Sequence, residues 1–148
     1  MKKSEITIKK YQQLAMQTCL PSAFNRRYAY YGFLSEMHEL RAKKYGLKAK
    51  EIRGDSEEKL AEIKEQIKDE IGDCFWFIAL QCELLEHKLV EFFDNKIQAS
   101  NEWTNGFDEI IRICKELKIT PLECMQRNID KLASRAERGK IKGNGDKR

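Results

Sequence analysis

Residues that interrupt helices are scarce in this chain. Its 148 residues include two prolines and eight glycines, and three of those glycines fall within the last ten residues. Because helix interiors tolerate proline and glycine least, the body of the chain can form long uninterrupted helices. We therefore expect an all-α fold, and the length favours a single domain over residues 1–148.

The charges are numerous but balanced. Lys and Arg number 28 and Asp and Glu number 24, which gives a formal net charge of +4, too small to favour a nucleic-acid partner. No apolar run approaches the roughly 18 residues of a membrane span, and no signal-peptide core follows the charged first residues. The five cysteines contain no C-x-x-C pair, which points to buried, reduced thiols. We expect a cytoplasmic protein with no membrane partner.

Apolar residues recur at steps of three and four along most of the chain. This periodicity predicts a bundle of about four to five amphipathic helices. The expected helices cover approximately residues 4–18, 24–45, 55–93, 107–117 and 121–139. Residues 95–106 are expected to form a connection, and the basic, Gly-containing tail 140–148 is expected to be disordered.

Capping signals indicate where several helices begin or end. Gly46 suits the position just past a helix end, so residues 47–55 are expected to form a loop. Asp55 followed by Glu58 resembles a capping box that opens the long central helix. The segment 120–123, Thr-Pro-Leu-Glu, combines an N-cap hydroxyl, a proline at the first helical position and a glutamate at the third, which predicts the start of the last helix.

Glu-x-x-Glu and Glu-x-x-Asp pairs do not identify a site by spacing alone, because they occur five times. They are Glu36/Glu39, Glu62/Glu65, Glu70/Asp73, Glu83/Glu86 and Glu91/Asp94. A helix turns about 100° per residue, so the position of a pair relative to the apolar stripe is more informative. Glu70 lies about 60° from the apolar stripe of the central helix. In a projection down the helix axis, Phe77 falls between Glu70 and Asp73. Glu36 lies about 60° from the apolar face of the second helix, with Glu39 one step further round.

Packing of these two helices against each other would bring four carboxylates together, those of Glu36, Glu39, Glu70 and Asp73. Like charges at that density raise each other's pKa and are costly to desolvate unless cations neutralise them. Mg²⁺ prefers carboxylate oxygens and keeps positions open for water and substrate phosphates. The residues alone leave two interpretations open: a divalent-cation site, or boundary residues that make interhelical salt bridges.

Four segments in chain order resemble the MazG-like all-α nucleoside triphosphate pyrophosphohydrolases. They are YQQLAMQT at 11–18, Glu36-x-x-Glu39, EIGDCFWF at 70–77, and NIDKLASR at 128–135 followed by the tail 139–148. In that family a Glu-Glu-x-x-Glu motif and a later Glu-x-x-Asp motif coordinate magnesium. Ser35 stands at the first acid of the first motif, and the 30 residues between Glu39 and Glu70 exceed the gap that is usual in compact members.

The resemblance implies hydrolysis of a nucleoside triphosphate to the monophosphate and pyrophosphate, within a helical bundle of the same type. It implies that water activated by Mg²⁺, with Mn²⁺ as a substitute, attacks the α-phosphorus. The implied metal ligands and catalytic residues are Glu36, Glu39, Glu70 and Asp73, and which of them takes the proton stays open.

The last helix is the expected source of substrate contacts. Asn128, Lys131 and Arg135 share a face distinct from its apolar stripe, and the resemblance implies that they contact the phosphates. Trp76 is the expected contact of the base. Family members dimerise or tetramerise, so we expect a homodimer or homotetramer.

Two other classes of protein compete with this interpretation. A di-iron bundle needs Glu-x-x-His on two helices, and the sequence contains no Glu-x-x-His. A non-enzymatic nucleic-acid or protein-binding module would use the basic last helix and the tail 140–148. Such a module would bind in a salt-dependent way and would not need the four acids.

Overall fold

The fold is helical over most of the residues that the structure describes. The computed structural model describes residues 6–97, 101–139, 141–142 and 145–146. The helices are α1 (Ile8–Gln17), a 3₁₀ turn (Pro21–Ala23), α2 (Arg26–Arg53), α3 (Glu57–Leu84), α4 (Val90–Phe93), α5 (Asn101–Leu117) and α6 (Pro121–Glu137). The predicted all-α class is confirmed, with six α-helices in the described residues where about four to five were expected.

The tail contains a minimal hairpin. Strand β1 (Ile141–Lys142) pairs antiparallel with β2 (Gly145–Asp146), and the remaining residues of the tail predicted to be disordered lie outside the described residues. Residues 4 and 5, which the first helix was expected to include, also lie outside them. Among the described helices, none combines the length and apolarity required to cross a bilayer.

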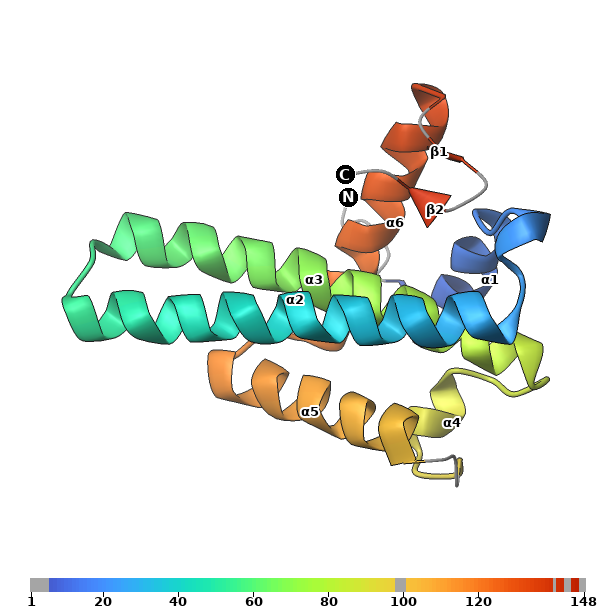
Figure 1. Cartoon of the computed structure of the whole chain (residues 1–148), viewed down its shortest axis with the longest axis horizontal. Coiled ribbons are helices and arrows are strands. Elements are labelled where there is room, and N and C mark those ends of the chain that lie inside the picture. The colour runs from blue at the N-terminus through green and yellow to red at the C-terminus, as the bar shows by residue number, and fades with distance from the viewer. Residues whose placement is uncertain (1–5, 98–100, 140, 143–144, 147–148) are drawn as a thin grey trace.

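Helices α2 and α3 form a long antiparallel hairpin whose turn projects beyond the other helices (Figure 1). Helices α1 and α6 pack on α3, and α5 lies along the hairpin on the opposite side in this view. The core is centred on α3, where residues 71–80 are all buried. The largest fully buried side chains include Phe33 and Met37 from α2, Phe75 and Ile78 from α3, and Ile110 from α5.

The second helix is longer than predicted. Gly46 lies inside α2, and the predicted loop 47–55 is wrong because the helix continues to Arg53. A glycine within a helix costs only about 1 kcal/mol relative to alanine, and the buried Leu47 keeps the next turn on the core. The helix ends instead at Gly54, whose φ of 76° provides the left-handed conformation of a C-terminal cap.

The central helix begins and ends differently from the prediction. Its N-cap is Ser56, whose side chain accepts a hydrogen bond from Lys59 N, whereas Asp55 pairs with Arg53 at 2.9 Å. The helix ends at Leu84, not near residue 93, and the chain turns through Glu86 at a φ of 58°. The apolar pattern continues past this turn because Leu89, just before the short α4, and Phe92, on α4, are also buried.

The last two helices test the remaining boundary predictions. Helix α5 begins at Asn101, inside the predicted connection 95–106, because Trp103 joins the core and stacks on Phe33 with ring centroids 4.4 Å apart. The predicted start of α6 is confirmed: Thr120 and Glu123 form a reciprocal capping box, and Pro121 occupies the first turn.

Candidate metal centre

Three acidic side chains from α2 and α3 meet beside the core. Among the described residues, Glu36, Glu70 and Asp73 each place one carboxylate oxygen within 4.8 Å of the others. Glu36 and Asp73 are each 4% exposed, and Glu70 is half-buried. Glu39, one turn further along α2, is exposed and hydrogen-bonded to Glu70. All four predicted acids therefore lie together, with three in a compact group, here called the acidic cluster, and Glu39 at its rim.

Helix periodicity explains why the acidic cluster is buried. Glu36 follows Phe33 by three residues and precedes Leu40 by four, and these neighbours are 1% and 0% exposed. Asp73 lies inside the buried run 71–80 of α3. Because side chains three and four apart share a helix face, the packing that buries the apolar neighbours also draws these carboxylates out of water.

The environment of Glu70 favours its protonated form. Its pKa is raised to about 7, chiefly because burial disfavours the charged carboxylate. A hydrogen bond with Glu39 and the charges of Asp73 and Glu39 raise the pKa further, while a hydrogen bond with Glu36 opposes them. Oε2 of Glu70 is buried and finds no hydrogen-bond partner among the residues that the structure describes. A buried oxygen of this kind is costly unless a donor or a cation reaches it.

Helix α6 brings two of its predicted substrate contacts onto Asp73. Asn128 Nδ2 donates to Asp73 Oδ1 at 3.2 Å, and Lys131 Nζ donates to the same oxygen at 2.6 Å. The Tyr11 hydroxyl on α1 donates in turn to Asn128 Oδ1 at 2.8 Å. Sequence reasoning assigned Asn128 and Lys131 to phosphate and gave Tyr11 no role, because residues 11, 73 and 128 meet only through helix packing.

A glycine permits the close approach of α3 and α6 at this point. A Cβ atom on Gly72 would lie 2.7 Å from the carbonyl oxygen of Cys124 and 3.0 Å from Cβ of Asn128. Any larger residue would therefore push α6 away from α3. The identity of residue 72 thus sets how near Asn128 comes to the neighbouring Asp73.

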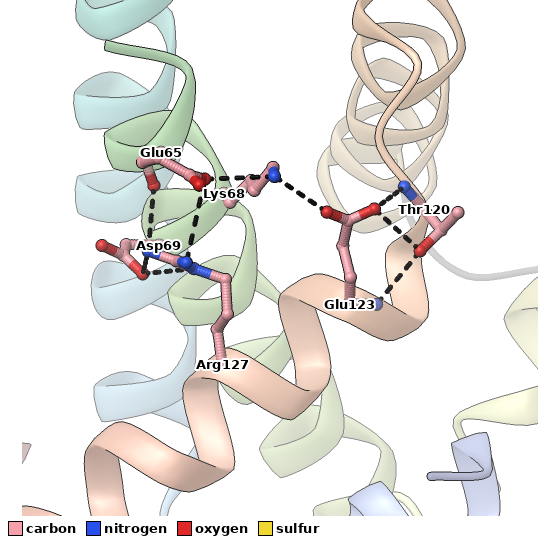
Figure 2. Close-up of polar contacts among 6 residues, drawn as sticks. All are labelled: Glu65, Lys68, Asp69, Thr120, Glu123 and Arg127. Carbon is pink, nitrogen blue, oxygen red and sulfur yellow. Dashed lines mark hydrogen bonds and ion pairs between the residues drawn. The ribbon is translucent and has the colours of Figure 1, made fainter. Parts of the chain in front are cut away.

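Ion pairs fix the register of α6 on α3 (Figure 2). Arg127 Nε and Nη2 each lie 3.0 Å from Asp69 Oδ1. Lys68 Nζ lies 2.9 Å from Glu123 Oε1, and Glu123 also accepts from Thr120 N in the capping box at 2.9 Å. Glu123 therefore both caps the N-terminus of α6 and binds α3 through Lys68. Because Asp69 and Arg127 immediately precede Glu70 and Asn128, these ion pairs hold α6 beside the acidic cluster.

The other two predicted substrate contacts are also close to the core. Arg135 is 9% exposed on α6. Trp76 is 8% exposed, donates from Nε1 to Thr18 Oγ1 at 3.0 Å and packs edge-on against Phe77 at 5.0 Å between ring centroids. The structure thus gives Trp76 a packing role, and its contact with a base stays a prediction.

An open hollow of about 500 Å³ lies on α2 next to this region, lined by Asn25, Arg27, Tyr28, Tyr31 and Gly32. Gly32 precedes Glu36 by four residues, so the hollow begins about one helical turn from the acidic cluster. Phe77 of α3 packs against the hollow, because its ring lies directly against Gly32 and its centroid is 5.6 Å from that of Tyr28.

Comparison of the chain with protein-family models, with curated proteins and with solved structures finds no match. The resemblance to the MazG-like pyrophosphohydrolases therefore rests on the sequence motifs alone.

Proposed function

We propose that the protein is a Mg²⁺-dependent nucleoside triphosphate pyrophosphohydrolase that releases the monophosphate and pyrophosphate. The observation that carries the proposal is the convergence of Glu36, Glu70 and Asp73 within 4.8 Å, beside Lys131 on α6. Its five cysteines are free thiols, which suits a cytoplasmic enzyme in a reducing compartment.

The donor atoms of the acidic cluster fit magnesium. They are carboxylate oxygens, which hard divalent cations prefer, and Mn²⁺ takes the same ligands. Burial raises the pKa of Glu70, and its Oε2 finds no hydrogen-bond partner in the described part of the chain. A bound cation would favour the charged carboxylate and contact this oxygen. Glu36, Glu70 and Asp73 would hold the ion, and Glu39 would reach it from the rim.

In the proposed reaction, the residues around the acidic cluster have different roles. A bound Mg²⁺ ion supplies neutralisation of the phosphate charge and activation of a water molecule. Glu39 is exposed and hydrogen-bonded to Glu70, so it is the carboxylate best placed to accept the proton of the attacking water. Lys131, 2.6 Å from Asp73, can turn its ammonium group to the β- and γ-phosphates. Asn128 holds Asp73 in place.

The hollow on α2 offers room for the nucleoside. It provides the rings of Tyr28 and Tyr31, and aromatic faces stack on any base. A nucleoside in this hollow would direct its triphosphate along α2 toward Glu36, one helical turn away.

We also propose that the protein assembles as a homodimer or homotetramer through the projecting end of the α2–α3 hairpin. Tyr45 and Ile52 on α2 are 77% and 79% exposed, and exposed apolar side chains that gather on one element mark protein contacts.

A pyrophosphate assay tests the proposed activity. Ribo- and deoxynucleoside triphosphates, including noncanonical ones, are incubated with the protein and Mg²⁺ or EDTA. We expect pyrophosphate from at least one nucleotide with Mg²⁺ and none with EDTA. No release from any nucleotide, together with salt-dependent binding of nucleic acid, would favour the binding module instead.

A further inference from the structure

Polar side chains of α1 and of its C-cap residue Thr18 connect this helix to distant parts of the chain. Gln12 Oε1 accepts from Leu89 N at 2.6 Å, and Thr18 Oγ1 accepts from Trp76 Nε1 at 3.0 Å. These two contacts hold the helix against the α3–α4 region. The third contact, from Tyr11, leads toward the acidic cluster.

Tyr11 begins a chain of two buried hydrogen bonds that ends at the acidic cluster. Its hydroxyl donates to Asn128 Oδ1 at 2.8 Å, and Asn128 Nδ2 donates to Asp73 Oδ1 at 3.2 Å. The carbonyl oxygen of Gly72 is more distant from the hydroxyl, at 3.4 Å. Because a hydroxyl carries one hydrogen, the shorter contact to Asn128 takes it.

The direction of these bonds matters for Asp73. With its oxygen bound by the hydroxyl of Tyr11, the Asn128 amide must turn its NH₂ group to the carboxylate. Hydrogen bonds in series also polarise one another, which strengthens the contact with Asp73. Tyr11 is 0% exposed and Asn128 is 3% exposed, so bulk water does not compete for either bond.

A tyrosine hydroxyl at this depth needs an explanation. A phenylalanine ring would fill the same core volume without a polar group to satisfy, and burial of a hydroxyl costs free energy that its hydrogen bond must offset. The hydroxyl of Tyr11 donates its hydrogen bond to Asn128, and the amide of Asn128 donates to Asp73 of the acidic cluster. Packing alone therefore does not account for this oxygen.

We propose that Tyr11 is a positioning residue for the cation site, and that it acts through Asn128 to hold the Asp73 carboxylate toward Glu36 and Glu70. This inference rests on the proposed function of the same site. Residues that orient metal ligands through hydrogen bonds commonly change metal affinity by about 10- to 100-fold when replaced.

Titration of the full-length protein with Mn²⁺ alone, followed by calorimetry, tests the inference without any turnover. Tyr11→Phe keeps the ring and removes the hydroxyl, and we expect about tenfold weaker Mn²⁺ binding. The matched control is Tyr30→Phe, which removes the same atom from a half-buried ring of α2 that belongs neither to the acidic cluster nor to the proposed hairpin contact. We expect this control to bind Mn²⁺ as the unmodified protein does.

A double-mutant cycle with Asn128→Ala tests the route of the effect. If Tyr11 acts through Asn128, adding Tyr11→Phe to Asn128→Ala leaves the Mn²⁺ affinity unchanged within about twofold, because coupled residues are not additive. A Tyr11→Phe protein that unfolds at a lower temperature but binds Mn²⁺ normally would overturn the positioning role and leave the proposed function standing. Absence of Mn²⁺ binding by the unmodified protein would overturn both.

Discussion

Lys131 on α6 donates to Asp73 on α3 across an Nζ–Oδ1 distance of 2.6 Å. The side chain of Asp73 is 5% exposed and that of Lys131 is 23% exposed, so the ammonium group lies where a buried acidic cluster meets solvent. A cation at this position compensates the carboxylates in the metal-free protein. In the proposed function, the same group would turn to a phosphate of the substrate once a divalent ion took its place beside Asp73.

Replacement of Lys131 separates these two effects. We expect Lys131→Gln to bind Mn²⁺ more tightly, because it removes a positive charge next to the metal ligands. Pyrophosphate release should fall by about 10- to 100-fold, the loss that corresponds to a charge-assisted hydrogen bond of about 1.5–3 kcal/mol. Calorimetry and steady-state kinetics measure the two quantities, with Lys64→Gln on the exposed face of α3 as the control. Weaker Mn²⁺ binding would mean that Lys131 supports the cation site directly.

Glu70 and Glu39 should respond differently to the same change. Glu70→Gln removes one charge of the acidic cluster at nearly constant volume, so we expect lost turnover and weakened Mn²⁺ binding with unchanged helix content by circular dichroism. Glu39→Gln alters a residue at the rim, and we expect kcat to fall by about 10²-fold, as for loss of a general base, with a smaller loss of Mn²⁺ affinity than in Glu70→Gln. Near-normal activity of Glu70→Gln would contradict its assignment as a metal ligand.

The stability of the metal-free protein should depend on pH through Glu70. The pKa of Glu70 in the folded protein is about 7, above its ordinary value of 4.5, so the folded state holds a proton that the unfolded chain releases earlier. The contribution of Glu70 to stability is therefore fully present below pH 4.5. It is lost as the pH rises from 4.5 through about 7, and it stays constant above that range.

Thermal unfolding in EDTA at pH 5 and pH 8 measures this loss of stability. Glu70→Gln, which cannot ionise, should flatten the dependence, and Mg²⁺ should raise the unfolding temperature more at pH 8 than at pH 5. An equal pH dependence in Glu70→Gln would assign the effect to other groups.

Gly72 and Gly46 offer a matched pair of helix glycines. Gly72→Ala would place Cβ 2.7 Å from the Cys124 carbonyl oxygen, and we expect a loss of about 1–3 kcal/mol, as for other overpacked sites, together with reduced Mn²⁺ affinity. Gly46→Ala meets no atom within 4 Å, and we expect a gain of about 0.5–1 kcal/mol from helix propensity. Urea unfolding gives both values. Equal effects would show that α6 does not approach α3 this closely.

The projecting hairpin end predicts the outcome of a sedimentation experiment. We expect the unmodified protein to sediment as a dimer or tetramer at micromolar concentration. Ile52→Lys places a charge at a side chain that is 79% exposed. We expect this variant to stay folded and to sediment mainly as a monomer. A monomeric unmodified protein would contradict the proposed assembly.

Helix boundaries show where sequence reasoning was limited. The capping box at Thr120 and Glu123 was predicted correctly because all of its donors and acceptors lie within four residues. The end of α2 was misplaced at Gly46, because a glycine ends a helix only where the backbone turns left-handed. The left-handed turn occurs at Gly54, after the buried Leu47, and there the chain turns back into α3.

The sequence by itself determined the helical class and which acids border the buried faces, since both follow from the residues per turn of a helix. Only the tertiary structure decided that Glu39 lies outside the compact acidic cluster, and that Tyr11 reaches Asp73 through Asn128. The hydrogen bonds from Tyr11 to Asn128 and from Asn128 to Asp73 join residues 117 and 55 positions apart, and they depend on the close approach of α3 and α6 at Gly72. Helix periodicity sets the direction of a side chain from its own axis, whereas helix packing sets what the side chain meets.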